Sequence, residues 1–176
     1  MIAEKLFLPD LMLSSYRELT PALLSELGVR ALISDIDNTL APYEELDASD
    51  EVVGWIGALK EAGVSVTLVS NNRRDRVERY NRRLLCNAYG NVKKPSVKYL
   101  VAAMEDMEST PEDTIFLGDQ LLTDALAAHR AGMRAVIVPP IKDKRSLFFR
   151  FKRSIERPYI KKYNKLHGKE TENDKT

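Results

Sequence analysis

"ISDIDNTLAPY", residues 33–43, ends an apolar run with two aspartates, Asp35 and Asp37, which a single residue separates. Burying carboxylates costs several kcal/mol unless a partner compensates their charge. Aspartate is also common in ordinary turns, so this stretch alone is compatible with a simple turn after a strand. Residues from the rest of the chain decide whether the two aspartates belong to a simple turn or to a site where a partner compensates their charge.

Short apolar runs alternate with helical patterns along the chain. Strands are expected at 30–36, 64–69, 114–118 and 134–138, with a weaker one at 87–91. Periodicity, capping residues and terminal glycines predict helices over 49–63, 74–85, 96–108 and 123–132, and a further helix opens at Thr20-Pro21. This order of elements predicts an α/β fold with a mostly parallel sheet.

Three of the expected strands end in polar residues. Ligands of an open parallel sheet bind beyond the carboxyl ends of its strands. If these strands are neighbours, one crevice receives Asp35, Asp37, Ser70 and Asp119, followed five residues later by Asp124. Clustered carboxylates repel one another, and a divalent cation that prefers oxygen ligands, Mg²⁺, removes this repulsion.

"VKKPS", residues 92–96, supplies the positive charge that such a site needs on its other side. Lys94 is the candidate, because Pro95 restricts it to an extended conformation and an ammonium suits phosphate and carboxylate contacts; Lys93 is the alternative. A carboxylate nucleophile, a metal ion, a hydroxyl and an ammonium are the components of phosphoryl transfer through an aspartyl-phosphate.

Four ordered segments, "DIDNTL", "VTLVSNN", "KKP" and "GDQLLTD", resemble the motifs of the haloacid dehalogenase-like (HAD) phosphatases. The resemblance covers residues 31–138. It points to the subfamily IIIA phosphatases, in particular the bacterial YqeG family, and extends to the phosphatidylglycerophosphate phosphatases of mitochondria and plastids. It implies a HAD-like Rossmannoid fold of three layers and hydrolysis of phosphomonoesters with Mg²⁺ through an aspartyl-phosphate.

The resemblance also implies roles for individual residues. Asp35 would attack phosphorus, and Asp37 would protonate the leaving oxygen and later activate water. An alkoxide leaving group needs this proton whereas a halide does not, so Asp37 favours ester hydrolysis over dehalogenation. Thr39 would brace the loop, and Ser70 with the Asn71 amide would bind the phosphoryl group.

The same resemblance assigns the metal ligands. Mg²⁺ would be held by the side chains of Asp35 and Asp119 and by the backbone carbonyl of Asp37. Asp124 would support a metal-bound water or the lysine from behind. Lys94 would balance the charge of the nucleophile and the phosphate.

Motif spacing limits what can cover the site. From Asp35 to Ser70 is 35 residues, of which an expected helix uses fifteen, and from Ser70 to Lys94 is 24. No room remains for a folded cap domain, so we expect an open site. An open site favours a large or membrane-presented phosphate ester over a small metabolite that needs enclosure.

Charge divides the chain into an expected phosphatase domain, residues 1–141, and a basic C-terminal tail, residues 142–176. Residues 142–165 contain ten Lys and Arg and two acids, a net charge of +8, whereas residues 1–141 carry −6. The tail mixes basic residues with Phe148, Phe149, Phe151, Ile155, Tyr159 and Ile160. Three partners therefore stay open for it: an anionic membrane surface, a nucleic acid, and the acidic body of the protein itself. The polar end, "GKETENDKT", is expected to be disordered.

Composition favours a globular protein of the cytoplasm, with 44% hydrophobic and 30% charged residues and a single cysteine, Cys86. The N-terminal segment lacks the features of a signal peptide. We expect a peripheral position at the inner face of the membrane if the tail binds lipid. A phosphatase for proteins or nucleic-acid ends, and a module that binds RNA or a ribosomal partner, are the competing functional hypotheses; the oligomeric state stays open.

Overall fold

The computed structural model describes residues 5–142 and 147–168, with only the backbone course given for 147–153. Six strands form one sheet in the order β1-β6-β5-β2-β3-β4, and every described pair is parallel. The strands are β1 (Leu11–Met12), β2 (Ala31–Ser34), β3 (Ser65–Val69), β4 (Asn87–Tyr89), β5 (Thr114–Gly118) and β6 (Arg134–Ile137). The predicted α/β fold with a mostly parallel sheet is confirmed.

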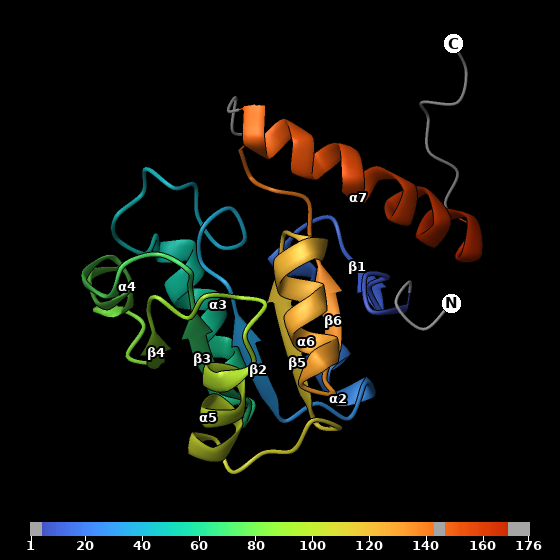
Figure 1. The fold of residues 1–176 in the computed structure, drawn as a ribbon. Coiled ribbons are helices and arrows are strands. Elements are labelled where there is room, and N and C mark those ends of the chain that lie inside the picture. The colour runs from blue at the N-terminus through green and yellow to red at the C-terminus, as the bar shows by residue number, and fades with distance from the viewer. Residues whose placement is uncertain (1–4, 143–146, 169–176) are drawn as a thin grey trace.

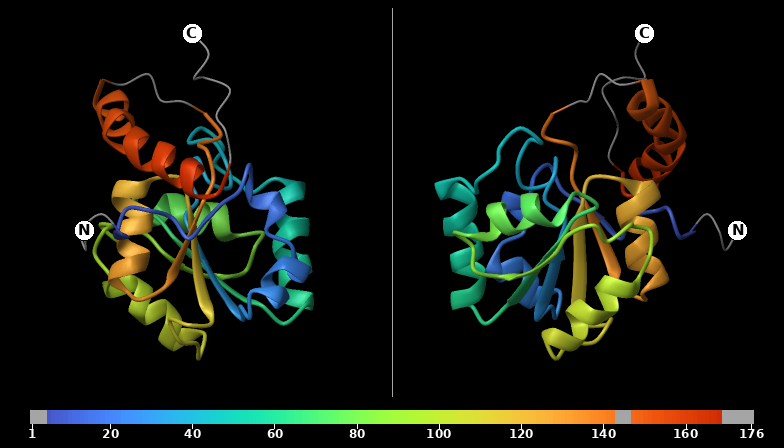
Figure 2. Two further views of the ribbon diagram at one scale, coloured as in Figure 1. Left: turned by 90° about the vertical axis from the view of Figure 1, so that its right-hand side faces the viewer. Right: turned by 60° about the vertical axis from the view of Figure 1, so that its left-hand side comes forward.

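Helices cover both faces of this sheet (Figure 1). One face carries α2 (Pro21–Glu26), α3 (Asp50–Glu61) and α4 (Arg74–Asn81), and the other carries α5 (Lys98–Asp106) and α6 (Leu126–Arg130). The left view of Figure 2 shows the sheet between α5 and α6 on one side and α2 and α3 on the other. Successive strand residues point to opposite faces, so Leu32 belongs to the first core cluster and Ile33 to the second. The fold therefore has three layers.

Side-chain caps fix where two of the helices begin. The Thr20 hydroxyl accepts a hydrogen bond from the Leu23 amide at 3.2 Å, and the Ser49 hydroxyl accepts one from the Val52 amide at 3.3 Å. Gly63 follows α3 with a φ of +82°, a left-handed conformation that suits glycine. These signals are the ones that the sequence offered.

The structure differs from the predicted elements in several places. β1 was not predicted, and β2 ends at Ser34 rather than at 36, so Asp35 lies in the loop that follows. The helix predicted at 123–132 begins earlier and is divided into a π-helical turn, η2 (Leu121–Ala125), and α6. A short 3-10 turn, η1 (Tyr16–Glu18), also precedes α2.

The basic C-terminal segment forms a long helix, α7 (Leu147–Leu166), which lies above the sheet in Figure 1. Its C-terminal half packs on the body: Tyr163 is buried, and its hydroxyl accepts a hydrogen bond from the Met12 amide at 3.0 Å. Tyr159 packs against Phe7 with ring centroids 5.3 Å apart. The side chains of Phe148, Phe149 and Phe151 and the polar end at 169–176 lie outside the described residues. No helix in the described part of the chain has both the length and the hydropathy needed to cross a membrane.

Candidate active site

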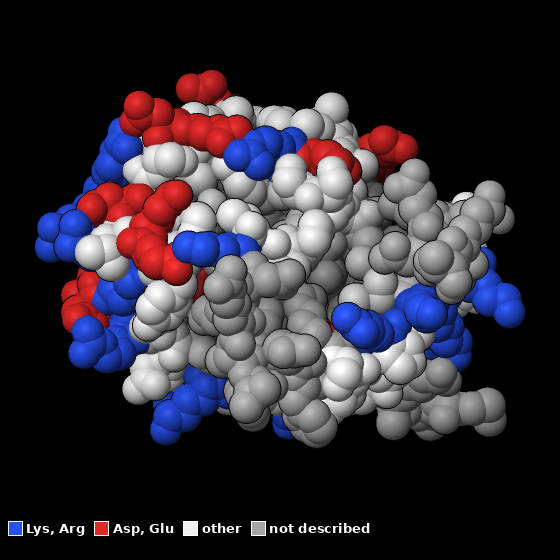
Figure 3. Space-filling model, turned by 90° about the horizontal axis from the view of Figure 1, so that it is seen from above, with Lys and Arg blue, Asp and Glu red and all other residues white. Residues whose placement is uncertain are grey.

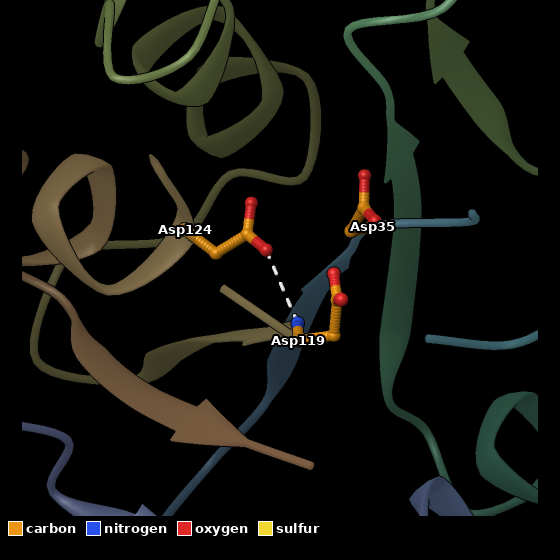
Figure 4. Close-up of side chains that lie close together, drawn as sticks. All are labelled: Asp35, Asp119 and Asp124. Atoms are coloured by element: carbon orange, nitrogen blue, oxygen red, sulfur yellow. Dashed lines mark hydrogen bonds between the residues drawn. The ribbon is translucent and has the colours of Figure 1, made fainter. Parts of the chain in front are cut away.

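Three carboxylates meet at the carboxyl edge of the sheet. One ligand oxygen from each of Asp35, Asp119 and Asp124 lies within 4.8 Å of the others, and all three residues are buried. Figure 4 shows these side chains pointing toward one another. Convergence of these side chains requires the strands before Asp35, Ser70 and Asp119 to be neighbours. The sheet order β5-β2-β3 satisfies this condition.

Lys94 lies among these acids with only 7% of its surface exposed. Its Nζ is 2.5 Å from Asp35 Oδ1 and 2.8 Å from Asp124 Oδ1. Burial alone would lower the pKa of Lys94, but the carboxylates of Asp124 and Asp35 raise it above its usual range, so the ammonium stays charged. Lys93, the alternative, is exposed.

The Asn71 side chain fixes the backbone of Lys94. Its Oδ1 accepts a hydrogen bond from the Lys94 amide at 2.6 Å, and its Nδ2 donates one to the Lys94 carbonyl at 3.3 Å. The peptide bond between Lys94 and Pro95 is cis. The Asn71 side chain therefore positions the lysine, and the phosphoryl contact expected at this residue is left to its backbone amide.

Asp35 is buried, its pKa is raised, and its carboxylate accepts a hydrogen bond. The pKa of Asp35 is raised to about 7 overall: burial raises it most, Lys94 partly offsets this, and the charges of Asp124 and Asp37 add to the rise. Thr39, for which the resemblance implies a role in bracing the loop, donates a hydrogen bond from its Oγ1 to Asp35 Oδ2 at 3.3 Å. The charged form of Asp35 is therefore disfavoured even beside the Lys94 ammonium, and a further cation bound here would favour it.

Asp37 lies beside the cluster and is held by different partners. Its Oδ2 accepts hydrogen bonds from Ser70 Oγ at 3.1 Å and from Asn72 Nδ2 at 3.2 Å. Its Oδ1 pairs with the buried guanidinium of Arg76 at 3.1 Å. Arg76 was not singled out from the sequence. These three donors fix the Asp37 carboxyl beside the nucleophile.

Asp124 is held against the loop that follows β5. Its Oδ2 accepts hydrogen bonds from the amides of Asp119 and Gln120, both at 3.1 Å. A Cβ added to Gly118 would lie 2.5 Å from Asp124 Cβ, closer than real atoms approach. Glycine at position 118 therefore leaves the space that the Asp124 side chain needs to reach the site.

The site opens to solvent through a pocket of about 260 Å³. Several of the site residues line it, together with Asn38, Tyr43, Gln120 and Thr123: Asp35, Asp37, Ser70, Asn71, Asn72, Lys94 and Asp124. The connection from β2 to α3 forms a loop rather than a folded cap, and Tyr43 on this loop is 48% exposed. The described residues thus leave the pocket accessible.

A divalent cation fits this donor set. All three ligands are carboxylate oxygens, and their mutual distances allow a single ion to contact them together. Buried like charges at this spacing need such an ion or proton uptake. The Asp37 side chain is not part of this group, and the role expected for its backbone carbonyl stays a prediction. Asp124, expected behind the ligands, lies among them.

Comparison with known proteins identifies the family. The probable phosphatase YqeG of Bacillus subtilis is 36% identical over 154 residues, which cover 88% of this chain and 90% of the relative. The chain belongs to the YqeG family of HAD-like phosphatases. The HAD-hydrolase-like family model matches residues 91–145, which contain Lys94, Asp119 and Asp124. The chain is accordingly an enzyme, a phosphatase of the HAD superfamily.

Solved structures share this fold at low sequence identity. The cobalt-bound deoxy-D-mannose-octulosonate 8-phosphate phosphatase of Haemophilus influenzae has a TM-score of 0.52 and 15% identity, over 78% of this chain and 92% of that one. CbbY from Rhodobacter sphaeroides, in complex with phosphate, has a TM-score of 0.50 and 16% identity, over 68% and 90%. At these identities the comparison supports the fold alone.

Proposed function

We propose that this YqeG-family phosphatase hydrolyses phosphomonoesters with Mg²⁺ through an aspartyl-phosphate on Asp35. The observation that carries the proposal is the set of three buried carboxylates beside the Lys94 ammonium, 2.5 Å from Asp35. Neither structural packing nor turn formation requires three acids and one lysine in a buried position at this spacing. Phosphoryl transfer requires a nucleophile, an electrophilic anchor and charge compensation together.

In the first step, an Asp35 carboxylate oxygen attacks phosphorus and forms a new oxygen–phosphorus bond. The bond from phosphorus to the ester oxygen breaks, and the Asp37 carboxyl gives its proton to the departing alkoxide. The hydrogen bonds from Ser70 and Asn72 orient Asp37 for this transfer. Lys94 compensates the charge that accumulates on the phosphoryl oxygens.

In the second step, water attacks phosphorus of the aspartyl-phosphate and Asp37 accepts the water proton. Inorganic phosphate leaves, and the Asp35 carboxylate is regenerated. Ser70 and the Asn71 backbone amide bind the phosphoryl oxygens during both steps. One residue thus acts as acid and then as base, which returns the site to its starting protonation.

Asp35, Asp119 and the Asp37 backbone carbonyl would hold Mg²⁺, and Asp124 would support it or contact it. When bound, the ion offsets the carboxylate charge and offers an electrophilic anchor for phosphate oxygens. The chemistry of the donor set supports Mg²⁺, because hard oxygen ligands select a hard cation.

For the substrate, we propose the phosphorylated headgroup of a lipid, phosphatidylglycerophosphate. The pocket is open, and the loop that brings Tyr43 to its rim also exposes Leu46. Figure 3 shows Lys and Arg side chains gathered over the C-terminal half of α7, where Arg157, Lys161, Lys162 and Lys165 are exposed. Basic residues beside apolar ones suit an anionic membrane surface. The enzyme would then work at the cytoplasmic face of a membrane.

The test gives purified protein and Mg²⁺ to vesicles that contain phosphatidylglycerophosphate, with Asp35→Asn as the matched control. Phosphate release by wild type and none by the variant supports both the chemistry and the substrate. Activity on a soluble aryl phosphate without activity on the vesicles overturns the lipid substrate alone. Release from 5′-phosphorylated oligonucleotides that falls steeply as salt rises would favour a nucleic-acid end instead.

A further inference from the structure

A buried carboxylate joins α7 to the segment 119–124, which carries Asp119 and Asp124 and is called the metal-binding loop below. Glu156 is 1% exposed, although it is one of only two acids in the basic segment 142–165. Its Oε1 accepts hydrogen bonds from the amides of Leu121 at 2.9 Å and Leu122 at 3.3 Å. These two residues open the π-helical turn that carries Asp124. The contact spans 35 residues of sequence and ends next to the acidic cluster.

Four consecutive backbone amides, those of residues 119 to 122, are divided between two carboxylates. Asp124 binds the first two from within the loop, and Glu156 binds the last two from α7. Amides at the start of a helical turn have no partner inside the turn, so each buried one needs an acceptor from elsewhere. Charge-assisted hydrogen bonds of this kind are the stronger ones.

We propose that Glu156 is a positioning residue for the metal ligands and that α7 thereby completes the active site. The inference rests on the proposed Mg²⁺-dependent function. Asp119 and Asp124 flank the amides that Glu156 binds, and their mutual repulsion with Asp35 acts to open the loop. Glu156 holds the loop closed from outside, so that the ligand oxygens stay within 4.8 Å of one another. Groups that orient metal ligands in this way typically change metal affinity by 10–100-fold when they are removed.

The chain offers a matched control for this role. Tyr163 lies on the same helix, is equally buried, and also binds a backbone amide of the body, that of Met12 in β1. Tyr163→Phe removes a hydrogen bond that docks α7 on β1, and it leaves Glu156 and its hydrogen bonds to the amides of Leu121 and Leu122 in place. It separates the loss of helix docking from the loss of loop positioning.

The experiment measures Mg²⁺ dissociation constants by calorimetry and unfolding temperatures in EDTA for wild type, Glu156→Ala, Glu156→Gln and Tyr163→Phe. We expect Glu156→Ala to weaken Mg²⁺ binding at least about tenfold and Glu156→Gln to recover part of that loss, because the amide oxygen still accepts hydrogen bonds. Tyr163→Phe lowers the unfolding temperature and keeps the wild-type dissociation constant.

Wild-type Mg²⁺ affinity in Glu156→Ala overturns the inference and leaves the proposed function intact. If Glu156→Ala does not fold, the Gln variant decides: an affinity equal to that of wild type overturns the inference, and a weaker one supports it. A wild-type protein that binds no Mg²⁺ overturns the proposed function itself, and the positioning role with it. Equal loss of affinity in Tyr163→Phe also overturns the inference, because helix docking alone would then explain the effect.

Discussion

The substitution Asp119→Asn removes one carboxylate of the acidic cluster. Without metal, we expect the variant to be more stable than wild type. With Mg²⁺, we expect it to be less stable than wild type. The amide has nearly the shape of the carboxylate but carries no charge. It leaves both contacts of Lys94, with Asp35 and Asp124, in place. Most substitutions of buried residues destabilise, so a gain of stability would be diagnostic.

The magnitude follows from the geometry. At separations of up to 4.8 Å, each pair of charged carboxylates repels by about 3.5 kcal/mol for an effective dielectric constant of roughly 20. Proton uptake by one of the three acids and the ammonium of Lys94 both reduce the repulsion that remains in the metal-free protein. We therefore expect Asp119→Asn to raise the free energy of unfolding by about 2 kcal/mol, or the unfolding temperature by about 4–8 °C.

The assay is thermal unfolding at neutral pH in EDTA and again in excess Mg²⁺. Mg²⁺ at about one hundred times its dissociation constant stabilises wild type by about 2.7 kcal/mol, and the variant by much less, so the order of stability reverses. Asp75→Asn, at an exposed carboxylate on α4, is the control, and its effect should stay within about 0.5 kcal/mol in both conditions. A metal-free variant less stable than wild type, or equal stabilisation of both by Mg²⁺, would refute this reasoning.

Three further changes have distinct expected results. Gly118→Ala pushes Asp124 out of place and should weaken Mg²⁺ binding at least about tenfold, whereas Gly54→Ala, which meets no atom within 4 Å, should bind normally in the same titration. Arg76→Met removes a partner of Asp37 and should lower kcat for alkyl phosphates about 100-fold. The kcat for p-nitrophenyl phosphate should fall by less than tenfold, because only the alkoxide leaving group needs a proton. Equal losses in kcat for the two substrates would contradict this. Burial lowers the pKa of His129, but hydrogen bonds with Asp10 and the Leu6 carbonyl raise it above 6.5 overall. The stability from this contact is therefore complete below pH 6.5 and lost as pH rises through the raised pKa, and His129→Gln should flatten that dependence in urea unfolding between pH 6 and 9.

The convergence of the acids could be predicted because one rule connects sequence with space. The carboxyl ends of neighbouring parallel strands meet at one edge, so polar residues after three apolar runs predict a shared site. Asp35, Ser70 and Asp119 follow this rule, and the sheet order satisfies it. β1 could not be predicted, because its two residues are too few to show the alternation of side chains that indicates a strand.

Arg76 and Glu156 could not be identified in this way because each reaches the site from another element. Arg76 is one of several arginines between 73 and 83, and composition does not say which of them turns inward. Its helical spacing from Tyr80, four residues on and fully buried, is the signal that could have found it. Glu156 offered a different signal, an isolated acid within a strongly basic segment.

The most direct measurement traps the covalent intermediate. The enzyme turns over substrate with Mg²⁺, is quenched in acid and treated with borohydride, which reduces an aspartyl-phosphate to homoserine, and is then sequenced by mass spectrometry. The expected result is homoserine at position 35 alone, absent without substrate and unchanged in a Tyr163→Phe sample. Reduction at Asp37 or Asp119, or no reduced residue during rapid turnover, would contradict nucleophilic attack by Asp35.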